Sequence, residues 1–126
     1  MKAKFIYESL EGYLTPKSNE DIIKNLSKLS NKELDEKLLT AAGNGQTDIC
    51  KMLIDAGANI NAKHPDNWTA LHSAVLHGHT DVVKILLNDR ADVNAMSKRG
   101  RKPLHLALKY KYKDIVDLLK SRGAIE

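Results

Sequence analysis

The chain lacks several features on which whole classes of protein depend. Among its 126 residues there is a single cysteine, Cys50, which excludes a disulfide framework and a zinc site built from cysteines. No run approaches the ~18 consecutive apolar residues of a membrane span, and the start of the chain lacks the apolar stretch of a signal peptide. We therefore expect a cytoplasmic protein, outside the membrane, whose cysteine is a small buried thiol rather than a reactive one.

A large excess of charge of either sign is also missing. Lysine and arginine total 20 against 16 aspartate and glutamate residues, a formal net charge of +4. This excess is too small for a protein that coats nucleic acid, although it leaves room for a local basic patch. Hydrophobic residues make up 42% of the chain, enough for one domain with a continuous core.

Residues that could carry catalysis are absent as well. Nothing resembles a nucleophile with an adjacent base and an orienting group, and no pair of carboxylates is placed to share a pocket. Gly43-Asn44-Gly45 lacks the lysine and hydroxyl residue of a phosphate-binding loop and is typical of a helix-ending turn. His72, His77 and His79 straddle a predicted helix end, and no acid or cysteine completes a metal site of familiar spacing. We expect no catalytic residue, no metal site and no cofactor.

What the chain does have is an internal repeat with a period of 33 residues. Thr-Ala-Leu-His-Ser-Ala at residues 69–74 realigns with Lys-Pro-Leu-His-Leu-Ala at residues 102–107. Gly-Ala-Asn-Ile-Asn-Ala at residues 57–62 realigns with Arg-Ala-Asp-Val-Asn-Ala at residues 90–95. A fixed period in this range predicts stacked units, each burying its apolar face against its neighbours. Such an array favours a binding surface over a catalytic pocket.

Each copy of the repeat reads as helix, tight turn, helix and extended loop. In the copy at residues 66–98, Thr69 suits an N-cap, and Gly78 can supply the left-handed residue that ends the short first helix. Residues 80–88 have apolar side chains at helical spacing and predict the second helix. A weaker copy repeats this pattern 33 positions earlier, at residues 38–54.

These motifs resemble the ankyrin repeat, whose core motif is Thr-Pro-Leu-His-x-Ala. The resemblance covers residues 33–126 and implies an all-α solenoid of three stacked helix-turn-helix repeats, at 33–65, 66–98 and 99–126. Loop "fingers" are expected between the copies, at residues 61–68 and 94–101. The family's usual role is protein–protein recognition without catalysis. The resemblance also implies that the histidine of the motif, His72, hydrogen-bonds between neighbouring loops.

Two substitutions depart from the repeat pattern. Arg90 replaces the glycine found at Gly57 and Gly123, and Lys111 replaces the glycine found at Gly45 and Gly78. If these turns remain left-handed, each residue other than glycine costs about 1 kcal/mol. The alternative is that the third copy ends its first helix differently.

Residues 1–32 lie outside the resemblance. Pro16 separates two short amphipathic segments, and Ser18 and Ser30 are each followed by an acid three positions on, as in a capping box. We expect a helical cap for the first repeat, because terminal repeats need a polar outer face. The alternative is a docking segment for a partner.

The expected partner surface is the concave face formed by the fingers and the first helices. A basic run at residues 98–102 lies on the second finger, and Trp68 is expected to be exposed on the first, beside Leu76. These features suit a protein partner with an apolar groove and an acidic rim, bound by a monomer. Single-stranded nucleic acid bound by residues 98–102 and 109–113 is the less favoured alternative. The predicted contact residues are Asp66, Trp68, Leu76, His77, Lys98, Arg99, Arg101, Lys109 and Tyr110.

Overall fold

The fold was obtained as a computed structural model that describes residues 24–26 and 28–126. In this part of the chain the structure is helical, without a β-strand. Its helices are α3 (Asn31–Asn44), α4 (Thr47–Asp55), α5 (Ala70–Leu76), α6 (Thr80–Asn88), α7 (Pro103–Lys109) and α8 (Lys113–Ser121), with a 3-10 turn at Pro65–Asn67. The predicted capping box at Ser18 and the predicted amphipathic segment before Pro16 lie outside the described residues.

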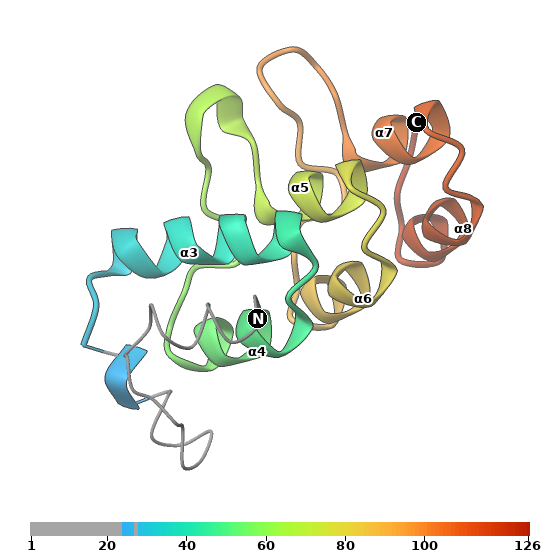
Figure 1. The fold of residues 1–126 in the computed structure, drawn as a ribbon. Coiled ribbons are helices and arrows are strands. Elements are labelled where there is room, and N and C mark those ends of the chain that lie inside the picture. Colours follow the sequence, from blue (N-terminus) through green and yellow to red (C-terminus); the bar gives the residue numbers. More distant parts are fainter. Residues whose placement is uncertain (1–23, 27) are drawn as a thin grey trace.

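The helices pair within each copy and the pairs stack along one axis (Figure 1). The first helices, α3, α5 and α7, lie side by side in one layer, and the second helices, α4, α6 and α8, lie side by side in the other. The two fingers project from the side of the first helices. The predicted all-α repeat architecture is confirmed, and α6 has the predicted bounds.

The starts of α3 and α5 follow the capping chemistry that the sequence predicts, whereas α6 begins after His79 without a side-chain cap. At α3, the backbone N–H of Ser30 donates to Oε1 of Glu33 at 2.9 Å, and the N–H of Glu33 donates to Ser30 Oγ at 3.2 Å. At α5, Thr69 Oγ1 accepts from the N–H of His72 at 3.3 Å. Each bond satisfies a donor that the first turn of a helix leaves without a partner in the helix.

The turn between the two helices of a copy is left-handed in all three copies. The φ angle is 74° at Gly45, 73° at Gly78 and 61° at Lys111. The third copy therefore ends its first helix as the others do, and the alternative of a different ending is wrong. Lys111 is exposed, so its side chain extends into solvent, but its backbone holds a conformation that costs about 1–2 kcal/mol without glycine.

Glycine at the first two of these turns is required by space as well as by backbone angle. A Cβ atom at Gly45 would lie 2.7 Å from Nδ1 of His79, and one at Gly78 would lie 3.0 Å from the ring of Tyr112. His79 and Tyr112 occupy the same repeat position, one copy further along. Each ring thus packs on the turn of the copy before it and couples neighbouring copies.

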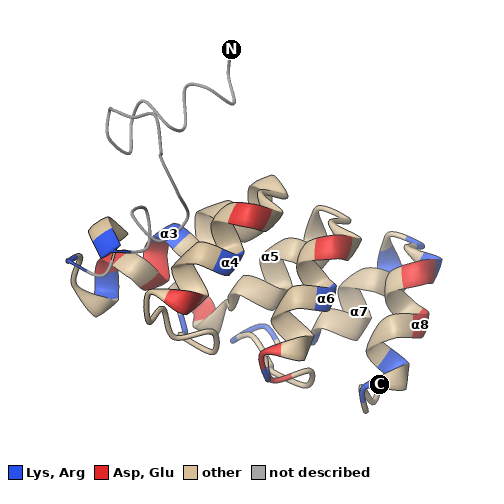
Figure 2. Ribbon diagram, turned by 90° about the horizontal axis from the view of Figure 1, so that it is seen from below, with Lys and Arg blue, Asp and Glu red and all other residues tan. Residues whose placement is uncertain are grey.

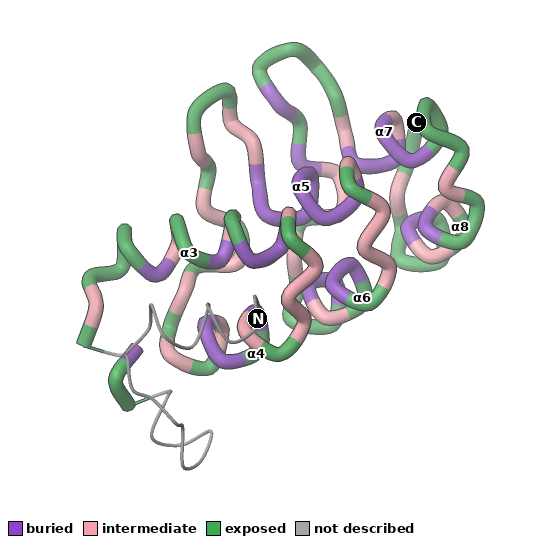
Figure 3. The backbone as a smooth tube through the Cα atoms, viewed as in Figure 1, coloured by how far each residue is buried: buried purple, intermediate pink, exposed green. Residues whose placement is uncertain are grey.

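The core runs without a break through the stack and lies between the two helix layers (Figure 3). Its largest fully buried apolar side chains are Leu34, Leu38, Leu53, Val75, Leu71, Leu86, Leu104, Leu106, Ile115 and Leu119. Ile49, which the apolar pattern of its helix also predicts in the core, is only half-buried, whereas Cys50 is completely buried as expected. Burial raises the pKa of the Cys50 thiol to about 12, which confirms the expected inert, buried cysteine. Leu26, from the segment before α3, is also buried against this core.

Arg90 provides a test of the backbone strain. Its φ is 72°, its side chain is exposed, and its carbonyl accepts a hydrogen bond that any residue could accept. We expect Arg90→Gly to raise the free energy of unfolding by up to about 1 kcal/mol, because glycine adopts this angle without strain. Urea denaturation should show the gain for Arg90→Gly but not for Arg90→Ala, and a loss with glycine would mean that the arginine side chain stabilises the turn.

Candidate partner-binding surface

The first finger is a tight hairpin with a strained tip. The N–H of His64 donates to the carbonyl of Trp68 at 2.9 Å and closes the loop. Asp66 and Asn67 both have positive φ angles, 67° and 57°. Asparagine tolerates this conformation, whereas the positive φ at Asp66 depends on how the hairpin closes. Asp66 is exposed at the tip.

The second finger is hydrogen-bonded to the first. Its own arms are joined by the N–H of Ser97, which donates to the carbonyl of Arg101 at 2.9 Å. The N–H of Lys98 donates to the carbonyl of Asp66 at 2.8 Å and ties the two tips together. The side chains of Lys98, Arg99 and Arg101 remain exposed. The fingers therefore present these cations from a braced backbone.

His72 fastens the second finger to α5. The side chain is fully buried, and its Nε2 lies 2.9 Å from the carbonyl oxygen of Arg101. Its Nδ1 accepts from the backbone N–H of Thr69 at 3.1 Å, so Nε2 carries the proton that is donated to Arg101. The predicted bridge between neighbouring loops is confirmed for His72. His105, at the same position of the motif and with the same prediction, instead accepts from the N–H of its own Lys102 at 3.0 Å, without a bond to another loop.

His72 should make stability depend on pH. Burial lowers the pKa of His72 below its ordinary value of 6.5, so the unfolded chain binds this proton more readily than the folded chain. The stabilisation is complete above pH 6.5 and is lost as the pH falls towards the folded-state pKa. We expect the thermal midpoint of unfolding to decrease as the pH is lowered from 6.5 to 4.5. This range lies above the ordinary pKa of Glu33, so the titration of that carboxyl falls mainly below it. His72→Gln should flatten this slope, and an unchanged slope in that variant would assign the effect to other groups.

Trp68 is placed differently from its prediction. The side chain is half-buried rather than exposed. Its Nε1 donates to Ser73 Oγ at 2.8 Å, and its ring stacks on His72 with 4.7 Å between ring centroids. The first turn of α5 therefore holds the indole in a fixed orientation. Ser73, five residues along, is the partner that sequence reasoning missed.

The other predicted contact residues lie at the far end of the first helices. Leu76 is half-buried at the end of α5, and His77 next to it is exposed. At the equivalent end of α7, Lys109 and Tyr110 are exposed, with the Lys109 Nζ 5.5 Å from the centre of the Tyr110 ring. The hydroxyl of Tyr112 donates to the carbonyl of Leu76 at 3.2 Å and joins these two helix ends.

This arrangement of helix pairs and linked fingers agrees with the comparison with known families. The family model for ankyrin repeats in three copies matches residues 17–97 and residues 38–125. The chain belongs to the ankyrin-repeat family. The match begins upstream of residue 33, where the motif resemblance starts. A search of the curated proteins finds no match.

Ankyrin repeats are generally modules of protein–protein interaction. Within the part of the chain that the structure describes, no group of three histidine, cysteine or acidic side chains is placed to hold a metal ion. The same residues include no helix with the length and apolar content to cross a bilayer.

The loops that join the ankyrin repeats are held by an asparagine ladder that sequence reasoning missed. Asn61 Oδ1 accepts from the N–H of Asp92 at 2.7 Å, and its Nδ2 donates to the carbonyl of Arg90 at 3.1 Å. Asn94, 33 residues later, makes the same two bonds to Ile125 and Gly123. The recurrence of asparagine at this repeat position was the available signal. The ladder fixes the base of each finger to the next copy.

The second finger and the second helices differ in charge. The second helices mix both signs, since Asp48 and Asp81 near their starts are followed by Lys51 and Lys84 one turn later (Figure 2). The second finger instead carries cations without a neighbouring acid in its own loop. The first finger carries both Lys63 and Asp66, so the difference belongs to the second finger and not to the finger side as a whole.

Proposed function

We propose that this ankyrin-repeat chain recognises another protein through its finger face. The finger face comprises the fingers at residues 61–68 and 94–101 together with the exposed ends of α5 and α7. The observation that carries the proposal is the bracing of the fingers, by Lys98 to Asp66 and by His72 to Arg101. A loop that is already ordered loses little conformational entropy on binding. The exposed cations are thus held ready for a partner.

The chemistry of this face suits a protein partner with an apolar groove and an acidic rim. The indole of Trp68 and the side chain of Leu76 supply apolar area in the middle copy, each only half-buried. Arg99 and Arg101 supply charge at the rim, where complementary charge mainly accelerates association. Because Trp68 also bonds to Ser73, Trp68→Ala changes stability together with binding. Charge reversal at an exposed arginine is therefore the cleaner variant.

Site-specific photo-crosslinking tests this proposal. A photoreactive amino acid at Arg99 should capture a partner protein from cells that produce the chain, and Arg101→Glu in the same molecule should reduce the yield. The matched control places the photoreactive residue at Lys84, which is exposed on α6 among the second helices. Equal capture from Lys84, or capture only from positions within residues 1–30, would contradict recognition through the finger face. Adducts with nucleic acid alone would favour the alternative function.

A further inference from the structure

The segment from the second finger to the start of α8 has a charge that the rest of the chain does not share. Residues 93–113 contain seven of the 20 lysine and arginine residues and none of the 16 acidic residues. The remainder of the chain is therefore acidic on balance, with 13 basic residues against 16 acidic ones. Among the residues that the structure describes, none of these seven side chains forms an ion pair. Their charge is directed at solvent rather than used inside the fold.

The same segment also exposes apolar side chains. Four large hydrophobic residues are exposed in the described part of the chain, and three of them fall here: Met96 at 49%, Leu108 at 41% and Tyr110 at 44%. Leu108 occupies the repeat position of Val75, which is completely buried. In the middle copy, α7 and its neighbours pack over this position, whereas in the third copy it faces outward.

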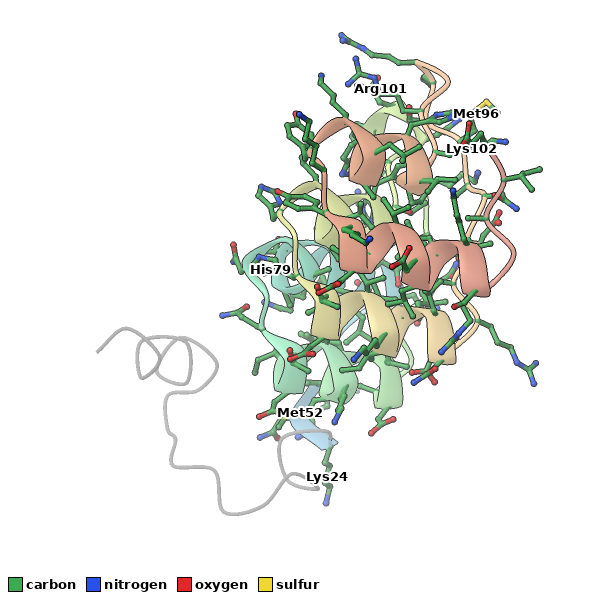
Figure 4. All side chains as sticks on the ribbon, turned by 90° about the vertical axis from the view of Figure 1, so that its right-hand side faces the viewer. Lys24, Met52, His79, Met96, Arg101 and Lys102 are labelled. Atoms are coloured by element: carbon green, nitrogen blue, oxygen red, sulfur yellow. The ribbon has the colours of Figure 1, made fainter. Side chains whose placement is uncertain are left out.

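The fold brings these cationic and apolar groups to one end of the stack. The Ser97–Arg101 hydrogen bond places Met96 opposite Lys102 across the second finger, and both lie with Arg101 at the finger end of the molecule (Figure 4). From there α7 leads over about 10 Å to Leu108, Lys109 and Tyr110. The Tyr110 ring stacks on Tyr112 with 6.0 Å between centroids, which holds this second group in place. We call the two groups together, at residues 96–102 and 108–113, the basic end.

We infer that the basic end binds an acidic amphipathic segment of the partner protein, one that combines carboxylates with aliphatic or aromatic side chains. This inference rests on the proposed function and names the partner's chemistry. Carboxylates match the arginines and lysines, with which they form charge-assisted hydrogen bonds. The apolar side chains of the segment match Met96, Leu108 and Tyr110, and burial of these exposed groups adds affinity. Nucleic acid would satisfy the cations but would leave the two aliphatic side chains without a suitable contact.

Selection from a library of random displayed peptides tests the inference directly. The full chain is used as bait, and a variant with Lys98→Glu, Arg99→Glu and Arg101→Glu is the counter-selection bait. These three side chains are exposed, and only the backbone atoms of these residues take part in the hydrogen bonds of the finger. The variant should therefore keep the thermal midpoint of the wild type. We expect the enriched peptides to be rich in acidic and apolar residues and to bind the variant roughly tenfold more weakly or worse. Met96→Ser with Leu108→Ser should also weaken binding, by severalfold.

The other outcomes separate failure of this inference from failure of the proposed function. Enriched peptides that are neutral or basic, or that bind the charge-reversed variant equally well, overturn the acidic segment but leave protein recognition by the finger face intact. Failure to enrich any peptide overturns it too, since a continuous segment should be selectable. Oligo(dT) that binds the chain at physiological salt, and binds the variant much more weakly, would overturn both the inference and the proposed function. Nucleic-acid binding normally weakens steeply as salt rises, so binding that persists at this salt concentration would indicate a nucleic-acid site.

Discussion

Leu71→Ala should lower the free energy of unfolding by roughly 2–5 kcal/mol, the range for a large-to-small change in a packed core. Leu71 is 1% exposed in the first turn of α5, and α5 packs against both α3 and α7 as well as α6. The cavity would therefore open at the junction of all three copies, where neighbouring helices are held on several sides and have little room to collapse. Urea denaturation followed by circular dichroism measures the loss.

Leu108→Ala provides the matched control for this prediction. It removes the same atoms from the same residue type in a first helix, but Leu108 is 41% exposed. A surface change of this kind should alter stability by about 0.5 kcal/mol or less. If both variants unfold at the wild-type urea concentration, the stack is not held together by this core.

Gly45→Ala should be comparably damaging, with a loss of about 2–5 kcal/mol. One part of the loss, about 1–2 kcal/mol, comes from a left-handed backbone at φ 74°. The other part, about 1–3 kcal/mol, comes from overpacking, because the new Cβ would lie 2.7 Å from Nδ1 of His79. The ring cannot move away freely, since its Nε2 lies 3.1 Å from the carbonyl oxygen of Gly43 in a hydrogen bond.

Gly57→Ala separates the two parts of that loss. Gly57 also has a positive φ, 112°, but a Cβ atom there would meet nothing within 4 Å. Only the backbone strain should remain, and the loss should be about 1–2 kcal/mol. Equal losses in the two variants would show that the His79 ring yields at no cost, and that it does not couple the first two copies as the geometry indicates.

Much of the fold could be predicted because its signals are local and repeated. Ser30 with Glu33 predicts a capping box from four consecutive residues, and the structure contains it. The bounds of α6 followed from apolar spacing, and the left-handed turn after α5 from Gly78. Each of these features depends on side chains within one helical turn, so the sequence alone contains the relevant physics.

The predictions that failed or were incomplete depend on contacts between distant residues. At Lys111 and Arg90, the sequence left open whether the turns stay left-handed, and the stack holds both at positive φ. The degree to which Ile49 is buried depends on how α4 is rotated against its neighbours, and this rotation buries Cys50 more completely. For Trp68, helix α5 supplied a hydrogen-bond partner that a loop position by itself does not indicate.

The sequence by itself determined the family and the three-copy helical architecture, because the period of 33 residues and the helix caps can be recognised from short stretches of consecutive residues. It also contains no familiar catalytic motif. The tertiary structure decided which groups are exposed. The backbone of the second finger is braced by bonds from Lys98 to Asp66 and from His72 to Arg101, and Leu108 is exposed where Val75, its equivalent, is buried. Exposure at a repeat position depends on what packs against it in the stack. Identical positions in the pattern therefore become core in one copy and exposed surface in another.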